Sequence, residues 1–244
     1  MSQKTPSPAG RPDDGRKRRW AQHNADRRAQ VIDAALAVLD RNDDPGGPVT
    51  AQQIADQAGI HRTGIYRYFE DKTDLDVAIQ REICDRLQAD LSRAVVLEGQ
   101  ARTAVHRVVD TYVRWAVAHP SWTRFAERAV PGATENPMAD VIGRIAELIE
   151  FAVDGFLALV GAKLDPDDQR LTGPWVAGLI SGCMASVRAW EGQGPNSVAL
   201  DQVVAFLSDT VWIQILGLAS SRGITMPETP LEALFTDPES TTSR

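Results

Sequence analysis

Apolar residues recur at helical spacing along most of the chain. Near the N-terminus, Ile32, Ala35, Leu36 and Leu39 fall at positions i, i+3, i+4 and i+7, which predicts an amphipathic helix over residues 24–40. Similar patterns follow, separated by glycine, proline and polar residues. They predict further helices at about 71–97, 101–119, 122–130, 138–160, 169–190 and 200–219. The pattern therefore predicts an all-α fold.

The most informative segment is a pair of short helices predicted on either side of Gly59. Thr50 and Gln53 have the spacing of a capping box, so a helix is expected to begin directly after Thr50. Gly59 is expected to end this helix, because glycine readily adopts the left-handed conformation of a C-terminal cap. In the next helical pattern, Ile65 and Phe69 share an i, i+4 spacing and predict a short buried face.

Two short helices joined by a tight, glycine-containing turn are typical of a helix-turn-helix unit, whose second helix can enter the major groove of DNA. The residues left exposed on that second helix are Arg62, Thr63, Tyr66 and Arg67. Guanidinium groups bind phosphates and guanine edges, and hydroxyl groups both donate and accept hydrogen bonds. The segment is therefore a candidate DNA-reading unit.

The run from Ala58 to Phe69, AGIHRTGIYRYF, followed by Asp71, Lys72 and Leu75, closely resembles the DNA-binding signature of TetR-type transcriptional regulators. The alanine-glycine turn, the Tyr-x-Tyr-Phe end and the lysine three residues later all occur in register. The resemblance implies an N-terminal three-helix DNA-binding domain followed by a helical body.

The resemblance also implies roles for individual residues. The recognition helix would extend from about His61 to Tyr68, with Arg62, Thr63 and Gly64 at the base edges. The other contacts would mainly fix the register on the DNA backbone. The residues expected to contact DNA in this unit are Thr50, Arg62, Thr63, Gly64, Tyr66, Arg67, Tyr68 and Lys72.

Two positions depart from the family pattern. His61 stands where such regulators usually carry Ser or Thr, so the recognition helix lacks its favoured cap hydroxyl, for which Thr63 can partly substitute. Gly64 replaces a residue that more often places a side chain in the groove. Glycine inside a helix also costs roughly 1 kcal/mol relative to alanine.

Charge is divided unevenly along the chain, whose net charge is -7. Residues 1–75 contain 12 Lys and Arg against 11 Asp and Glu, whereas the remainder contains 14 against 22. DNA repels an acidic body, so the N-terminal part is expected to make the contact. Residues 1–22 are expected to form a disordered basic arm in which Arg18 and Arg19 contact DNA. A solvated run of charges is the alternative.

The last two long helices, at about 169–190 and 200–219, are apolar on more than one side. They need cover from more than one neighbour, which points to a dimer. In TetR-type regulators these helices form an intermolecular four-helix bundle, so the resemblance implies a homodimer of this kind. The expected organisation is an arm at 1–22, a DNA-binding domain at 23–73, an effector-binding and dimerisation domain at 74–225 and a loose tail at 226–244.

Aromatic and sulfur-containing residues in the predicted body are candidates for a small-molecule site. Helical bundles build such sites from facing apolar side chains with a few polar groups, and the resemblance implies an effector pocket. For each residue, the alternative is an ordinary place in the core. The candidates are Tyr112, Trp115, Trp122, Phe125, Phe151, Trp175 and Met184.

Residues for catalysis or metal binding form no recognisable pattern. The four histidines lack a second ligand at a suitable spacing, and the two cysteines have no metal-type spacing with them. A glycine-rich phosphate loop and a nucleophile elbow are absent from the sequence. We therefore expect a protein that is not an enzyme and uses neither metal nor cofactor. No stretch approaches the roughly 20 apolar residues needed to cross a bilayer, so a cytoplasmic location is expected.

These patterns predict a ligand-responsive, DNA-binding transcriptional regulator. Its expected partners are double-stranded operator DNA, a small-molecule effector and a second copy of the chain. A repressor released from a pseudo-palindromic operator by its effector is the main hypothesis. The alternatives are an activator, a ligand-independent DNA-binding factor, or a helical small-molecule carrier whose helix-turn-helix only packs.

Overall fold

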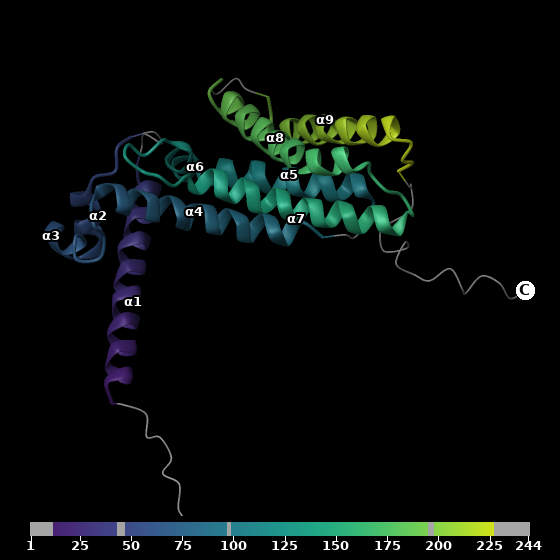
Figure 1. Ribbon diagram of the computed structural model, residues 1–244. Coiled ribbons are helices and arrows are strands. Elements are labelled where there is room, and N and C mark those ends of the chain that lie inside the picture. The colour runs from purple at the N-terminus through teal and green to yellow at the C-terminus, as the bar shows by residue number, and fades with distance from the viewer. Residues whose placement is uncertain (1–11, 43–46, 97–98, 195–197, 227–244) are drawn as a thin grey trace, which may run out of the picture. The chain divides into compact units, whose positions relative to one another are not determined.

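The computed structural model describes residues 12–42, 47–96, 99–194 and 198–226, with side chains from Arg19 onward except that of Leu159. The expected N-terminal residues 1–11 and most of the expected tail lie outside this part. Every regular element in the described part is a helix, which confirms the predicted all-α fold (Figure 1). The helices are α1 (Pro12–Asp40), α2 (Ala51–Ala58), α3 (Arg62–Ile65), α4 (Lys72–Ala94), α5 (Ala101–Ala118), α6 (Pro120–Glu127), α7 (Pro137–Leu159), α8 (Pro166–Glu191) and α9 (Leu200–Ser221).

The chain divides into two compact units. The first contains residues 1–79 together with the short segment 130–133, and the second contains residues 80–129 and 134–244. The division falls inside α4, so the beginning of this helix belongs to the first unit and the rest to the second.

The core of the first unit joins α1, α2, α3 and the start of α4. Helix α2 packs against α1 and α3, as the apolar spacing of each helix requires. Ile65 and Phe69, predicted as a buried pair, are 0% and 2% exposed. The other large side chains of this core are Val31, Leu36, Leu39, Ile54, Leu75 and Ile79.

Helix α1 begins at Pro12, well before the predicted start at residue 24. The expected flexible basic arm is therefore helical over residues 12–22. Pro12 stands at the helix start, where proline is tolerated. Gln22 also donates a hydrogen bond of 2.8 Å to Asp26 one turn later. Local helix-stabilising interactions account for the extension in a segment with little apolar content.

The second unit is a bundle of long helices, with the short α6 at one end (Figure 1). Helix α5 packs against α9, and α7 packs against α8. Asn136 and Asp165 cap α7 and α8 by accepting hydrogen bonds from backbone N–H groups in the first turn, and a proline follows each cap. The largest fully buried side chains of this unit are Ile83, Val113, Val141, Val187 and Val204.

Helix α9 leaves much of its apolar surface uncovered within the chain. Phe206 is 71% exposed and Ile213 is 66% exposed. By length and composition α9 is sufficient to cross a membrane, so the expectation that no segment approaches this length is wrong. The charged residues Asp201 and Asp209 interrupt the apolar run and pair with Arg114 and Arg102 of α5. A single such helix is weak evidence for a membrane protein.

Candidate DNA-binding surface and ligand cavity

The turn before α2 has the capping box that the sequence predicted. The Thr50 hydroxyl oxygen accepts a hydrogen bond of 3.2 Å from the Gln53 backbone N–H, and the Gln53 side-chain oxygen accepts one of 2.9 Å from the Thr50 backbone N–H. At the other end, Gly59 has φ of 66°, and its N–H caps the helix. Thr50 also donates its hydroxyl hydrogen to Gln53 at 2.8 Å. Its first role is therefore to fix the start of α2.

Helix α3 is shorter than the predicted recognition helix from His61 to Tyr68. It ends at Ile65 and is followed by turns through Tyr68. The His61 side chain makes no capping hydrogen bond, and Gly64 lowers the helix propensity at the centre of the segment. Both features were noted as departures from the family pattern, and together they account for the short helix.

The buried side chains of Ile65 and Phe69 determine which residues near α3 reach solvent. Arg62, Thr63 and Arg67 are exposed, and Tyr66 is 40% exposed. Gly64 is half-buried, and the space where a Cβ atom would lie has its nearest neighbours, atoms of Ile60, at 3.9 Å. The surface thus presents two guanidinium groups, a hydroxyl and a phenol on one short segment, a combination suited to phosphates and base edges.

Arg28 of α1 ties the end of this segment to the rest of the first unit. Its guanidinium donates a hydrogen bond of 2.6 Å to the Tyr68 carbonyl and pairs with Asp74 at 3.0 Å. It also lies over the Phe69 ring, 4.2 Å from the centroid. No role was assigned to Arg28 from the sequence. A signal was present, because Arg28 lies seven residues before Ala35 and shares the buried stripe of α1.

The remaining predicted DNA contacts occupy two helices of the first unit. Lys72, at the start of α4, forms an ion pair with Asp76 one turn later. An ammonium group has three N–H donors, so this pairing leaves donors for a phosphate. Arg18 and Arg19 both lie in α1, and the Arg19 side chain is exposed.

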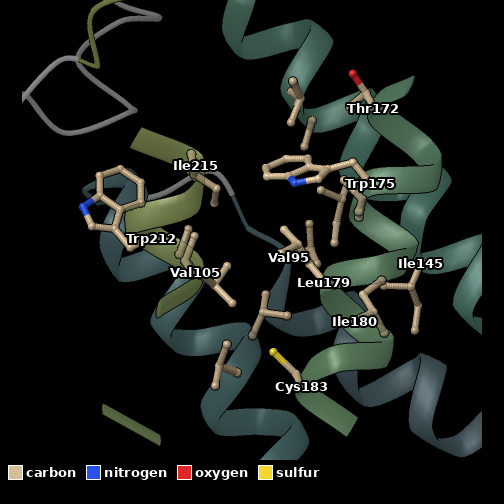
Figure 2. A pocket seen from close by; sticks show the side chains of 18 of the residues that line it. Val95, Val105, Ile145, Thr172, Trp175, Leu179, Ile180, Cys183, Trp212 and Ile215 are labelled. Carbon is tan, nitrogen blue, oxygen red and sulfur yellow. The ribbon is translucent and has the colours of Figure 1, made fainter. Parts of the chain in front are cut away.

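The second unit contains an apolar cavity of about 320 Å³ between α4, α5, α7, α8 and α9. Figure 2 shows Val105, Trp175, Leu179, Cys183 and Ile215 around the hollow. Its described walls include no Lys, Arg, His, Asp or Glu. The volume is at the lower end of the range for small-molecule sites, and an apolar lining is typical of them.

Three of the seven predicted ligand-binding residues, Tyr112, Trp175 and Met184, line this cavity. Phe151 does not: it is 78% exposed, because α7 turns its other face, with Ile149 and Val153, toward the hollow. Trp115, Trp122 and Phe125 are buried without lining the cavity.

Trp115 and Trp122 belong instead to an aromatic cluster at the junction of α5 and α6. The His119 ring stacks on Trp122 with centroids 4.3 Å apart, and Trp115 meets Trp122 edge-on at 6.5 Å. Arg86 lies over the Trp122 ring. The cluster packs the short α6 against α5. The residues predicted to form a single aromatic site therefore fall into two groups, one lining the cavity and the other buried in the core.

Most of the cavity wall was missed in the sequence because it is aliphatic. Residues such as Val105, Leu179 and Ile215 have the helical spacing of any core residue, and only the mutual placement of five helices leaves space between them. Trp212 of α9 and Cys183 of α8 also contribute to the wall. The signal for the cavity that the sequence did offer was that α8 and α9 are apolar on several sides.

Tyr112, which forms part of the cavity wall, also carries an unpartnered polar atom. The residue is 7% exposed, and its hydroxyl is buried without a hydrogen-bond partner. Close by, one carboxylate oxygen of Glu127 is also buried and unpartnered, while the other pairs with Arg188 at 2.9 Å. Burial, followed by the negative charges of Glu127 and Glu191, raises the pKa of Tyr112, so its hydroxyl remains a hydrogen-bond donor.

In the part of the chain that the structure describes, no three His, Cys, Asp or Glu side chains gather in a way that would hold a metal ion. Cys84 is buried, and burial raises its pKa to about 12. Burial likewise raises the pKa of Cys183. Both thiols are therefore protonated at neutral pH, a state that is poorly nucleophilic.

The chain is similar in sequence to known transcriptional regulators. Residues 31–79 match the family model described as bacterial regulatory proteins, tetR family. The uncharacterized HTH-type transcriptional regulator Rv0472c of Mycobacterium tuberculosis is 24% identical over 211 residues, which cover 86% of each protein. The HTH-type transcriptional repressor LfrR of Mycolicibacterium smegmatis is 34% identical over 84 residues, covering 34% of this chain and 42% of LfrR.

Among solved structures, a tetR-family transcriptional regulator from Streptomyces coelicolor superposes with a TM-score of 0.61, at 21% identity and over 86% of each chain. This likeness supports the same helical fold over the superposed residues. Relatives of this family are transcriptional regulators and not enzymes, which confirms the prediction that the chain is not an enzyme. The family match over the helix-turn-helix, the relatives and the shared fold together identify the protein as a TetR-type transcriptional regulator.

Proposed function

We propose that the protein is a repressor that binds a pseudo-palindromic operator as a homodimer and is released by a small molecule. The observation that carries the proposal is the exposed polar segment from Arg62 to Arg67, held on a capped helix-turn-helix. A second chain presents the same segment, so two copies recognise two half-sites. The cytoplasm, where DNA is accessible, is the proposed location.

The contacts with DNA divide into two classes. Arg62, Thr63 and Gly64 lie at base edges, where guanidinium and hydroxyl groups distinguish one sequence from another. Thr50, Tyr66, Arg67, Tyr68 and Lys72 fix the register on phosphates, with Arg18 and Arg19 of α1 adding charge. Arg67 and Tyr66 are exposed enough for this role. The DNA-binding domain is proposed at residues 23–73 and the effector-binding and dimerisation domain at 74–225, with an arm before them and a tail after.

The proposed dimer interface uses the last two long helices, α8 and α9. Phe206, Ile213 and Leu216 of α9 expose apolar surface in the single chain. Large exposed apolar side chains gathered on one helix are typical of a protein-protein interface. A second copy covers this surface in the proposed assembly, and the charged ends of α9 remain at its edge.

The proposed effector site is the apolar cavity of the second unit. A ligand there acts by linkage: it lowers operator affinity to the extent that it prefers the conformation less suited to DNA. The family relative LfrR is named a repressor, which supports the proposed sign of regulation.

Fluorescence anisotropy with DNA from immediately upstream of the coding region tests this function. At two salt concentrations and with unrelated DNA as competitor, we expect saturable binding that survives the competitor and protects a palindrome. Attraction that disappears equally for all DNA as salt rises would be counterion-driven only, and would favour a small-molecule carrier. Binding at a site whose occupation increases transcription would identify an activator.

A further inference from the structure

We propose that the effector is an uncharged molecule that is apolar throughout, and that Trp175 sets the upper limit of its size. The inference rests on the ligand-responsive function proposed above and adds the chemical class and the size of the ligand. It follows from the composition of the cavity walls, from the engagement of the polar groups around them and from the position of the Trp175 indole in the hollow.

The cavity walls present mainly carbon to a ligand. In the described part of the chain, no lining residue carries a formal charge at neutral pH, and most are aliphatic or aromatic. A charge placed between such walls loses its hydration and gains no ion partner, which is costly. Burial of a hydrocarbon body is favourable in proportion to its apolar area. The walls therefore select an uncharged ligand.

The hydroxyl and indole groups of the lining give a charged ligand no anchor. The Thr172 hydroxyl donates a hydrogen bond of 3.1 Å to the Asp168 carbonyl. The Tyr112 hydroxyl has almost no accessible surface, so a ligand in the cavity meets other atoms of this residue. Figure 2 shows the Trp212 nitrogen on the far side of its ring from the hollow. The Trp175 N–H is a neutral donor, and one such bond does not compensate for burying a full charge.

Two arginines that lie beside lining residues are also engaged. Arg222, which follows α9, donates hydrogen bonds of 2.9 and 2.8 Å to the Asp168 carboxylate. Arg107 of α5 donates hydrogen bonds of 2.9 and 2.5 Å to two backbone carbonyls at and after the end of α4. Lys163, in the loop before α8, is exposed, so solvent screens its charge. A carboxylate on the ligand would compete for these cations with existing partners or with water.

Trp175 closes the cavity on the side between α8 and α9. Its indole projects from α8 into the hollow, toward Ile215 of α9 (Figure 2). A second hollow of about 340 Å³ lies between α8 and α9, and Trp175 borders both spaces together with Leu179, Cys183 and Val211. These side chains form the wall between the two spaces, and the indole is the largest of them. Trp175 therefore limits the length of the ligand.

The volume indicates the size of the ligand. A dry apolar cavity of about 150 Å³ holds one benzene molecule, and the present cavity of about 320 Å³ is roughly twice that size. Two linked six-membered rings, as in biphenyl, match this space. Biphenyl, biphenyl-4-carboxylate and 4-(aminomethyl)biphenyl share one rigid body and differ in charge, so they form a matched set of probes.

The test is equilibrium dialysis of each probe against the full-length protein at about pH 7.5, with free and bound amounts measured by chromatography. At this pH the carboxylate is negative and the aminomethyl group is positive. We expect biphenyl to bind with a dissociation constant at least about 10-fold lower than that of either charged probe. Equal or tighter binding of a charged probe would overturn the uncharged ligand class, and so would an absence of biphenyl binding.

Leu179→Trp and Val105→Trp fill the cavity from α8 and from α5, so they test where biphenyl binds. Each variant should weaken biphenyl binding at least about 10-fold, because a close-packed interior has no other room for the probe. Phe151→Ala is the control: Phe151 is apolar and 78% exposed on α7, and it does not line the cavity. Thermal unfolding identifies the variants that fold. Full biphenyl affinity in either folded variant would overturn the assignment to this cavity.

Trp175→Ala tests the size limit with m-terphenyl, which has one more ring than biphenyl. Removal of the indole should let m-terphenyl bind at least about 10-fold more tightly than it binds the wild-type protein, because the added ring then finds space. Trp20→Ala is the matched control, because Trp20 is 68% exposed in the first unit. Equal affinity of m-terphenyl for Trp175→Ala and the wild-type protein would overturn the role of Trp175.

The same probes added to the protein-operator complex separate this inference from the proposed function. If biphenyl binds with the expected preference but leaves DNA binding unchanged, the ligand class stands and the ligand-released mechanism fails. If operator DNA binds normally and biphenyl does not bind the protein, the ligand class fails while DNA binding stands.

Discussion

Arg28 donates a hydrogen bond of 2.6 Å to the backbone carbonyl of Tyr68, which lies 40 residues further along the chain. The bond links α1 to the end of the segment proposed to read DNA. The same guanidinium pairs with Asp74 of α4. One side chain thus connects three parts of the first unit, including the segment proposed to read DNA.

Arg28→Met should destabilise the first unit and weaken operator binding. Methionine keeps the unbranched stem but removes every donor, which leaves the Tyr68 carbonyl and the Asp74 carboxylate without this partner. We expect a loss of about 1–2 kcal/mol in the free energy of unfolding, measured by urea denaturation. Arg27→Met is the control, because Arg27 is exposed and bonds only to Gln30 on its own helix. Equal effects of the two variants would contradict the role of Arg28.

The Gly64→Ala variant tests whether glycine in α3 only lowers the helix propensity or also allows DNA to approach closely. The backbone there is helical, and the added Cβ would meet only ordinary contacts with Ile60. Helix propensity alone predicts an increase of up to about 1 kcal/mol in stability. If Gly64 lies against a base edge, the methyl group should reduce operator affinity in spite of that gain. Anisotropy and urea denaturation on the same variant give both results, and a rise in both would show that DNA does not approach Gly64 closely.

Lys72→Ala and Arg62→Ala should differ in how they alter DNA binding. A lysine at a phosphate releases about one counterion, so its loss should weaken binding to all sequences and lower the slope of log K against log salt by about 1. Arg62 is proposed at a base edge, so its loss should also reduce discrimination at one position of the operator, by about 1–3 kcal/mol. Salt titrations against cognate and single-substitution operators measure both quantities. An unchanged salt slope for Lys72→Ala would contradict the phosphate contact.

Glu127 should make the stability of the protein depend on pH below neutrality. Burial raises the pKa of Glu127, Arg188 opposes this rise and Glu191 adds to it. The folded state therefore binds the proton more tightly than the unfolded chain, whose glutamate pKa is about 4.3. Stability is then greatest below that value and falls as pH rises through the raised pKa. Glu127→Gln removes this titration, so urea denaturation should show the variant gaining stability relative to wild type between pH 4 and pH 7. A constant difference across this range would contradict the assignment.

The two cysteines should differ in their accessibility to thiol reagents. Cys84 is 1% exposed with a pKa of about 12, so it should resist maleimide labelling in the native state. Cys183 lines the cavity and is only partly buried, so a small apolar maleimide should reach it first. Mass spectrometry after limited labelling identifies the modified residue. Protection of Cys183 by a cavity ligand is expected, and preferential labelling of Cys84 would contradict the structure.

The sequence determined the features that depend on neighbouring residues. Thr50 and Gln53 form their capping box because the two side chains are three residues apart, and Gly59 ends α2 because only its own backbone conformation is involved. Ile65 and Phe69 are buried together because they are only four residues apart, and the turn after α3 is closed by a hydrogen bond of 3.2 Å from the Phe69 N–H to the Ile65 carbonyl. The all-α fold and the DNA-binding family follow from such local patterns.

Tertiary structure decided the features that depend on which face of a helix is covered. Arg28 acts through a carbonyl 40 residues away, and Phe151 faces solvent while aliphatic Leu179 lines the cavity. Helical spacing shows that a residue lies on an apolar stripe, but it does not show whether the opposing helix fills the space in front of it. The cavity exists because five helices that are distant in sequence pack together without filling the space between them. Whether that space stays open depends on the packing of all these helices in the second unit.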